Sequence, residues 1–567
     1  MIKHLNKFVF IFLCISGIFC VNDLTAQDRY VLQLADKNNS PFNINNPSAF
    51  LSPRSIARRQ KQNIAITTND LPVNPSYLTA ISNTGATILN YSKWLNTVTI
   101  QTADTNILNA CIALPFVLSG NNVGRVAQPN EISEVSKTKF SEKYNRNNPF
   151  AEQSNSTSKV AAFNYGPGFH QINMMNGDAL HNSGYSGDGM MIAIMDAGFW
   201  RADSCSIFDS LFMNNQIVTT WDFVLGNSFV FDYHSHGSSC LSTMAANLPG
   251  VMVGSAPHAK YILLRTEDGA TENIIEEYNW AAAAEFADSI GADVFTTSLG
   301  YTLFDNPAHN HTYATLDGNT APMTIAEDLA AEKGIVVINS AGNEGNSAWN
   351  YVSVPADADS NLAIGAVDSM EQYASFSGKG PTVDGRVKPD VCAQGAGTYV
   401  VWPGDGSMVP GNGTSFSGPL LAGLAACLWQ THPMLSNMDI VQAIKKSASQ
   451  YAAPDSLLGY GIPDFTQASM ILGGIDPTSL PTEDEIYALY PNPSSNDVTV
   501  MFFTTTAQTI TVSVYDAIGR KVFANKMDVA PIFINEIPIK INNTSGVYNL
   551  EIINEAGTKL HKSIVRQ

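Results

Sequence analysis

The 567-residue chain has little positive charge: 31 lysines and arginines stand against 50 aspartates and glutamates, and the formal net charge is −19. A surface of this sign repels the phosphates of nucleic acids and of anionic lipids, so we expect neither as a partner. Charged residues make up only 14% of the chain, whereas hydrophobic residues make up 44%, which favours packed globular domains. At this length a single core is not expected, and we predict several domains.

Cysteines are few and widely spaced. Of the seven, Cys14 and Cys20 lie in an apolar segment near the N-terminus. The remaining five are Cys111, Cys205, Cys240, Cys392 and Cys427. An odd, scattered set excludes a disulfide framework, and spacings typical of metal ligands are also lacking. We therefore expect that no cofactor is required.

Long apolar runs are missing beyond the N-terminus, so we expect no transmembrane segment. The first 26 residues combine Lys3 and Lys7 with an apolar run that ends at Leu24-Thr25-Ala26, a pattern typical of a cleavable signal peptide. We expect cleavage after Ala26 and export of the chain. A lipoprotein anchor at Cys20 fits less well, because the bulky Phe19 precedes it.

Three distant motifs each hold one residue of a potential catalytic triad. Asp196 follows the apolar run 190–195, which is typical of a buried strand. His236 and Ser415 each open a run of small residues that reads as a buried helix. A serine hydroxyl becomes a strong nucleophile only when an imidazole takes its proton and a carboxylate orients that imidazole. The order Asp, His, Ser is one of the known chain orders of such triads.

A fourth residue, Asn343, is predicted to stabilise the oxyanion. It ends a turn that follows the apolar run 335–338, and its side-chain amide is a suitable donor. The backbone N–H of Ser415, at a helix N-terminus, is the second predicted donor. An alternative role for Asn343 is to cap the turn.

Other residues of the same types have simpler interpretations. His234 is interpreted as a solvated loop residue, and Asp232 lies in a polar insertion without a buried strand before it. The pair Glu276-Glu277 lies on a predicted helix, 271–289, and is interpreted as part of its solvated face. Around this helix, predicted strands at 261–264, 294–297 and 335–338 alternate with helices, which indicates an α/β domain with a parallel sheet.

The motifs resemble the signature blocks of the subtilisin family of serine peptidases over about residues 164–472. The matching blocks are 196–198, 236–238, 298–300, 341–343 and 413–415. The resemblance implies a subtilisin-like parallel sheet flanked by helices. Relatives commonly carry a structural calcium ion, and this sequence neither excludes nor locates one. The resemblance also implies that an extended substrate pairs with two short segments. Their residues are Ser298, Leu299, Gly300, Ser340, Ala341 and Gly342.

Four positions bear on the packing around the triad. Ser239 and the pair Phe416-Ser417 depart from the residues usual in this family, and we expect altered packing behind the nucleophile. Cys240 lies one helical turn after His236 and is similar to a buried thiol of some relatives. We predict that it lies directly beneath the imidazole.

The chain is divided into five predicted parts. They are a signal peptide (1–26), an α+β inhibitory prodomain (27–150), the catalytic domain (160–473), a linker (474–488) and a small β-sandwich (489–567). The polar stretch 136–159 is the predicted processing region. In the C-terminal part, Tyr490-Pro491-Asn492-Pro493 and Ser545-Gly546-Val547-Tyr548-Asn549-Leu550 resemble motifs of the sorting domain of the Bacteroidetes type IX secretion system. The alternatives are an unrelated N-terminal module and a C-terminal module that binds carbohydrate or protein.

Taken together, these features predict a secreted or surface-attached serine endopeptidase that is made as a zymogen. Its expected partners are polypeptide substrates and the type IX secretion machinery, and we expect a monomer. Another serine hydrolase, such as an esterase, is one alternative; in an α/β-hydrolase, however, the Asp and His follow the serine. An inactive adhesin on a peptidase scaffold is the other.

Overall fold

The computed structural model describes residues 28–126, 133, 135–140, 143–144, 163–474, 483–495, 497–506, 508–529, 534–541 and 545–567. The predicted signal peptide lies outside them. Among the described helices, none has the length and apolar character needed to cross a bilayer. The five described cysteines are buried and free, as their spacing predicted.

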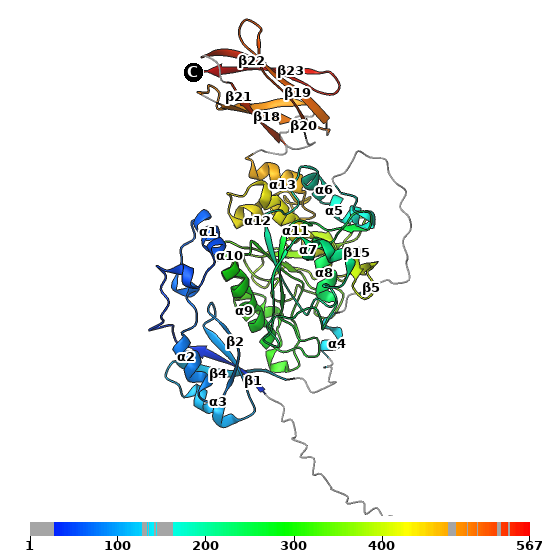
Figure 1. Ribbon diagram of the computed structural model, residues 1–567. Helices are drawn as coiled ribbons and strands as arrows, with labels where there is room; N and C mark the ends of the chain where they lie inside the picture. The colour runs from blue at the N-terminus through cyan, green and yellow to red at the C-terminus, as the bar shows by residue number, and fades with distance from the viewer. Residues whose placement is uncertain are drawn as a thin grey trace, which may run out of the picture.

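A seven-stranded parallel sheet forms the centre of the molecule (Figure 1). In spatial order the strands are β14 (Val391–Gln394), β13 (Leu362–Val367), β12 (Val336–Ser340), β11 (Val294–Thr297), β6 (Met191–Asp196), β10 (Lys260–Arg265) and β7 (Ile217–Asp222). Most of these strands are buried throughout, which explains their unbroken apolar runs. Thr297 of β11 pairs with both Met195 and Asn339, so β6, β11 and β12 end at one edge.

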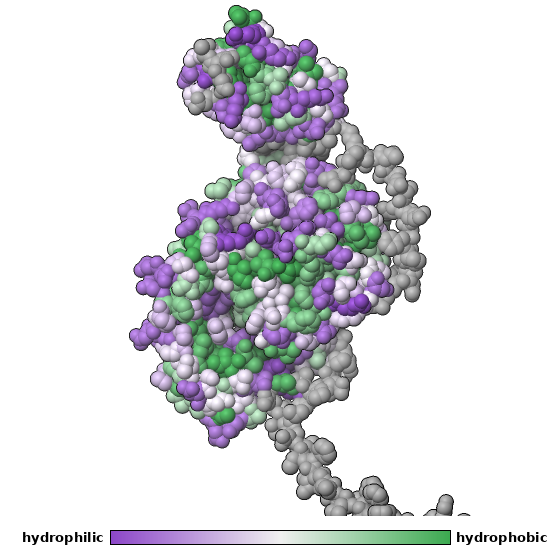
Figure 2. All heavy atoms as spheres, viewed as in Figure 1, coloured by the Kyte–Doolittle hydropathy of each residue, from purple (hydrophilic) through white to green (hydrophobic). Residues whose placement is uncertain are grey.

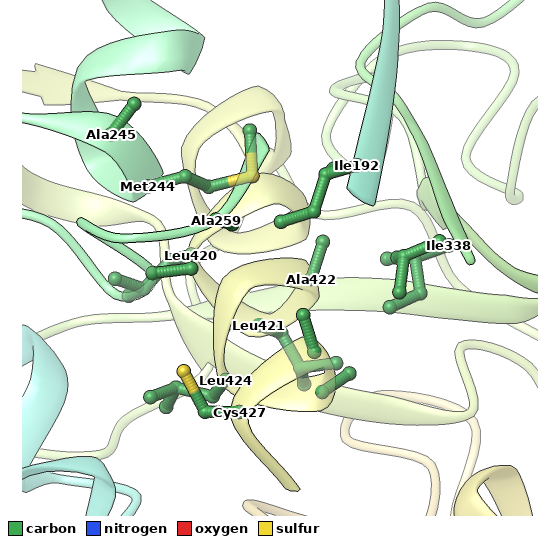
Figure 3. Packing of buried hydrophobic residues seen from close by; sticks show 14 of the residues in the cluster. Ile192, Met244, Ala245, Ala259, Ile338, Leu420, Leu421, Ala422, Leu424 and Cys427 are labelled. Carbon is green, nitrogen blue, oxygen red and sulfur yellow. The ribbon is translucent and has the colours of Figure 1, made fainter. Parts of the chain in front are cut away.

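Helices cover both faces of this sheet, and alternate residues of β6 point into two different cores. Ile192 and Ile194 belong to one core, whereas Met191, Ala193 and Met195 belong to the other. The first core contains α8 (His236–Ala245) and α11 (Thr414–Thr431), and the second contains α9 (Ile275–Ile290) and α10 (Pro322–Glu332). Figure 3 shows the packing of α11 through Leu420, Leu421, Ala422, Leu424 and Cys427 near Ile192 and Ile338.

The N-terminal domain is a four-stranded antiparallel sheet with three helices. Its strands are β1 (Asp28–Leu34), β2 (Thr87–Ser92), β3 (Thr97–Thr102) and β4 (Val117–Arg125) in the order β2-β3-β1-β4, and its helices are α1 (Pro53–Lys61), α2 (Pro75–Ser82) and α3 (Thr105–Ile112). The domain lies against α9 (Figure 1), where Val31 and Val123 pack with Ile275.

Buried ion pairs add to this contact with α9. Asp288 binds Arg58 and Arg59 at 2.5 and 3.0 Å, and Glu285 accepts hydrogen bonds from the backbone N–H groups of Lys93 and Trp94. The domain is therefore fixed to the helix by charge as well as by apolar contact.

The C-terminal part consists of two antiparallel sheets around a common core, as predicted for a β-sandwich. One sheet holds β17 (Glu485–Tyr490), β18 (Asp497–Phe503) and β21 (Ile534–Lys540); the other holds β20 (Lys521–Val529), β19 (Gln508–Tyr515), β22 (Gly546–Ile553) and β23 (Lys559–Arg566). The face in Figure 2 shows polar and apolar residues interspersed across the molecule.

Candidate active site

Asp196 and His236 meet where β6 ends and α8 begins. The imidazole Nδ1 lies 2.8 Å from Oδ1 and 3.0 Å from Oδ2 of the carboxylate, and both side chains are fully buried. A Cβ atom on Gly237 would lie 2.4 Å from the carbonyl oxygen of Gly198, so the glycines in both motifs permit this close approach. The carboxylate holds the proton on Nδ1, which leaves Nε2 able to act as a base.

Ser415 lies in the first turn of α11 and is 2% exposed. Its carbonyl oxygen accepts hydrogen bonds from Ser298 Oγ at 2.9 Å and from Cys240 Sγ at 3.2 Å. Because the same sulfur lies 3.8 Å from His236 Nε2, the prediction of a thiol beneath the imidazole is confirmed. Burial raises the pKa of the Cys240 thiol to about 11, so it stays protonated and acts as a donor.

The residues that depart from the family pattern, Ser239, Phe416 and Ser417, are all buried. Ser239 Oγ donates to the carbonyl oxygen of Val401 at 3.0 Å. Phe416 is fully buried and packs with Cys240, Val400 and Val409 in a small apolar cluster. Phe416, next to Ser415, anchors the first turn of α11 in this cluster, whereas Ser239 is bonded to the backbone at Val401.

Asn343 lies beside the N-terminus of α11. Its Oδ1 accepts hydrogen bonds from the backbone N–H and the hydroxyl of Thr414, at 2.8 and 3.0 Å. These contacts fix the orientation of the amide, so that its NH₂ group is the part that can donate hydrogen bonds in the cavity. Asn343 is thus held against the start of α11 rather than shown to cap its own turn, and its role as an oxyanion donor stays a prediction.

One cavity contains most of the predicted site. Its lining includes Ser298, Leu299, Gly300, Ser340, Gly342, Asn343 and Ser415. Ala341 lies behind this wall: its N–H donates to Ile364 and its carbonyl oxygen accepts from Ser353. Asp196 and His236 are outside this lining, and His236 is next to Ser415 because Cys240 contacts both residues.

A short segment that precedes the catalytic domain enters the cavity. Residues Lys139 and Phe140 line it, and the Phe140 ring centroid lies 4.9 Å from that of His236 and 4.2 Å from that of His234. Further along, β5 (Lys143–Tyr144) pairs with Gly411 and Asn412 of β16 (Ser407–Asn412), just before Ser415. The predicted processing region 136–159 thus contains a short helix, α4 (Ser136–Lys139), and the strand β5.

The interpretation of Glu276-Glu277 as a solvated face is wrong, since both side chains are buried. Glu277 binds His311 at 2.7 Å, whereas Glu276 forms a cluster with Glu267, Glu272 and the ammonium of Lys139. His234 is likewise half-buried rather than solvated, because it stacks on Phe140 and its Nδ1 accepts from the N–H of His236. The position of Glu267 directly after β10, at the functional edge of the sheet, was the signal available in the sequence.

Among the described residues, a single group of potential metal ligands is close enough to share an ion: Asp196, His236 and Cys240. A calcium ion takes oxygen ligands, so a group with one imidazole and one thiol does not suit it.

Comparison with known proteins agrees with this geometry. The model described as "Subtilase family" matches residues 187–461. "Peptidase S8 propeptide domain, Bacteroidota" matches residues 29–148, and "Secretion system C-terminal sorting domain" matches residues 488–566. The last match indicates secretion or attachment at the cell surface.

Individual relatives match the central half of the chain. Subtilisin from Bacillus pumilus is 32% identical over 298 residues, which cover 51% of this chain and 94% of the relative. Subtilisin E from Bacillus subtilis (strain 168) is 32% identical over 283 residues, 49% of this chain, and the match spans 65% of that protein. The crystal structure of MycP1 from the ESX-1 type VII secretion system is 20% identical, with a TM-score of 0.42, over 55% of this chain and 90% of that one. The identity, the extent of the match and the signature blocks show that the chain belongs to the subtilisin family of serine peptidases.

Proposed function

We propose that the protein is a secreted endopeptidase that cleaves polypeptides with Ser415 as nucleophile, His236 as general base and Asp196 as orienting carboxylate. The observation that carries this proposal is the 2.8 Å contact between Asp196 Oδ1 and His236 Nδ1. The same imidazole lies 3.8 Å from the sulfur of Cys240, which in turn contacts the carbonyl oxygen of Ser415 in the first turn of α11. Burial of both groups strengthens the contact, because little water competes with it.

In the proposed reaction, His236 Nε2 takes the hydroxyl proton as Ser415 Oγ attacks the scissile carbonyl carbon. The imidazolium that forms is stabilised by Asp196 and then passes its proton to the leaving amine. The negative oxygen of the tetrahedral intermediate accepts hydrogen bonds from the NH₂ group of Asn343 and the backbone N–H of Ser415. Water then hydrolyses the acyl-enzyme by the same route.

The N-terminal domain keeps the enzyme inactive in this proposal. Phe140 lies over the imidazole and β5 occupies an edge beside Ser415, so a substrate cannot reach the nucleophile until this segment leaves. The predicted parts are the prodomain (27–150), the catalytic domain (160–473) and the sorting domain (489–567). In this proposal the prodomain makes the protein a zymogen, and the sorting domain directs it to the type IX machinery. The monomeric state stays a prediction.

A single substitution tests the assignment. Ser415→Ala in the full chain is expected to abolish casein cleavage and self-processing, with a loss in kcat of at least ~10⁴-fold. Ser417→Ala is the matched control: Ser417 lies on the same helix, and its hydroxyl donates to the carbonyl oxygen of Thr414. Casein cleavage that persists in Ser415→Ala would refute the proposal. Hydrolysis of esters without casein cleavage would favour the esterase alternative, and no hydrolysis by the wild type would favour the adhesin.

A further inference from the structure

The cavity that contains Ser415 ends in a buried acidic pocket, formed by Glu267, Glu272 and Glu276. Glu267 follows β10, Glu272 lies in the loop before α9, and Glu276 lies in the first turn of α9. Each side chain is at most 5% exposed, and Glu267 belongs to the same cavity lining as Ser415. Three carboxylates at such depth are costly unless a cation compensates them.

The ammonium of Lys139 fills this pocket. Its Nζ lies 2.6 Å from Glu267, 2.9 Å from Glu272 and 2.5 Å from Glu276, and the carbonyl oxygen of Thr271 accepts a further hydrogen bond at 3.2 Å. The Lys139 side chain itself is only 5% exposed. Its three N–H donors thus face three carboxylate oxygens, an arrangement that suits a compact ammonium.

Second contacts hold two of the carboxylates in place. The Tyr301 hydroxyl donates to Glu267 Oε1, and the backbone N–H of Asp268 donates to Glu276 Oε1 at 3.0 Å. In both residues the other oxygen, Oε2, is left to face the ammonium. The pocket is therefore built by the catalytic domain, and Lys139 supplies the cation.

Direction along the chain places this pocket relative to the nucleophile. Lys139 immediately precedes Phe140, which stacks near His236, and the segment continues to β5 beside Gly411 and Asn412. A substrate peptide that crosses the cavity in the same direction therefore places in the acidic pocket a residue on the N-terminal side of its cleaved bond.

Resting on the proposed peptidase function, we propose that Glu267, Glu272 and Glu276 form a substrate subsite that selects a lysine on the N-terminal side of the cleaved bond. In the zymogen, Lys139 occupies this subsite. Departure of the N-terminal segment removes the cation, and ionisation of these buried side chains then requires another. A lysine of a substrate restores the compensation, whereas an uncharged side chain of similar length does not.

A divalent cation is a poor alternative occupant. Among the described residues, Glu267, Glu272 and Glu276 are not a set whose ligand atoms lie close enough together to share one ion. The carboxylates surround the ammonium from several directions, each at its own hydrogen-bonding distance. This spacing suits a ligand that brings its own hydrogen-bond donors.

The test uses the active protein purified from culture medium and two fluorogenic peptides with the sequence of residues 136–144. One has lysine at the position of Lys139, and the other has norleucine, which is uncharged and of similar shape. We expect kcat/KM to be at least about tenfold higher for the lysine peptide, a difference of ~1.4 kcal/mol. The double variant Glu272→Gln/Glu276→Gln is expected to reduce this ratio to within about twofold, while it still cleaves the norleucine peptide.

Glu277→Gln is the matched control, because Glu277 lies buried on the same helix but binds His311 instead. It is expected to retain the lysine preference. Equal kcat/KM for the two peptides with the wild-type protein would overturn the subsite, even if the double variant did not fold. Cleavage of neither peptide, together with no cleavage of casein, would instead overturn the proposed function on which the subsite rests.

Discussion

Single side chains at the active site act through orientation as much as through chemistry. The amide of Asn343 illustrates this, because its oxygen is held by two hydrogen bonds from Thr414, the residue just before Ser415. An amide that is already oriented pays no reorganisation when the oxyanion forms. In the proposed reaction, the contact with Thr414 therefore orients Asn343 before the oxyanion forms.

Replacement of this donor gives a prediction at the residue scale. Asn343→Ala is expected to lower kcat by ~10²–10³, the value known for the corresponding asparagine of subtilisin, a relative of this chain. KM for a peptide substrate should change little, because the hydrogen bond forms mainly in the transition state. Steady-state kinetics with one peptide measure both constants. A rise in KM at constant kcat would assign Asn343 to substrate binding instead.

At the scale of elements, α9 is the helix of the catalytic domain against which the N-terminal domain packs. The helix carries four buried acidic residues, which are Glu276, Glu277, Glu285 and Asp288. Lys139 pairs with the first, His311 with the second, and groups of the N-terminal domain contact the other two. The sequence of α9 alone is typical of a helix with a solvated acidic face. The partners of its acidic residues come from distant segments, which no local pattern reveals.

Loss of the Asp288 charge tests this connection. Burial opposes ionisation of Asp288, but Lys93, Arg58 and Arg59 outweigh it and hold its pKa below the usual value. Asp288→Asn leaves buried guanidinium groups without their main anion, and we expect the free energy of unfolding to fall by ~3–5 kcal/mol. Urea denaturation of full-length Ser415→Ala, with and without Asp288→Asn, measures the change.

The control for that experiment is Glu332→Gln, an exposed position at the end of α10. We expect it to change the free energy of unfolding by no more than ~0.5 kcal/mol. If Asp288→Asn were equally mild, the buried ion pairs would not hold the N-terminal domain against α9.

At the scale of the whole molecule, the acidic pocket couples protonation to zymogen stability. Burial raises the pKa of Glu272 to about 8 and that of Glu276 well above its usual value, although Lys139 opposes both shifts. The folded zymogen therefore binds more protons than the unfolded chain between about pH 4.5 and pH 8. Stability from these groups is present below the unfolded pKa and is lost as the pH rises through that window.

Thermal unfolding of the full-length Ser415→Ala protein from pH 5 to pH 8.5 tests this coupling. We expect its Tm to fall more steeply with pH than the Tm of the same protein with Glu272→Gln and Glu276→Gln, because glutamine does not titrate. Other groups, such as the buried His181, titrate equally in both proteins and cancel in the comparison. Parallel Tm curves would contradict the assigned protonation.

The sequence by itself determined the fold class and supplied the residues of the candidate site. Each residue of the candidate site lies in a local motif; these residues are Asp196, His236, Asn343 and Ser415. The motifs contain glycines, an apolar run or small residues, which close packing at a strand end or a helix start requires. Alternation of buried strands and helices likewise predicted the parallel sheet, because each strand shows its burial in its own composition. The element boundaries differ by a few residues, as for α9, which begins at Ile275 rather than at 271.

Only the tertiary structure decided what fills the cavity and what compensates its buried charge. Lys139 is far from Glu267, Glu272 and Glu276 in the sequence, and a lone lysine in a polar stretch shows no local sign of burial. Periodicity reports the environment of a residue only through its near neighbours, whereas an ion pair depends on where two distant segments meet. The contact between Lys139 and the three glutamates sets the path of the N-terminal segment through the cavity. The proposed lysine subsite rests on the same contact.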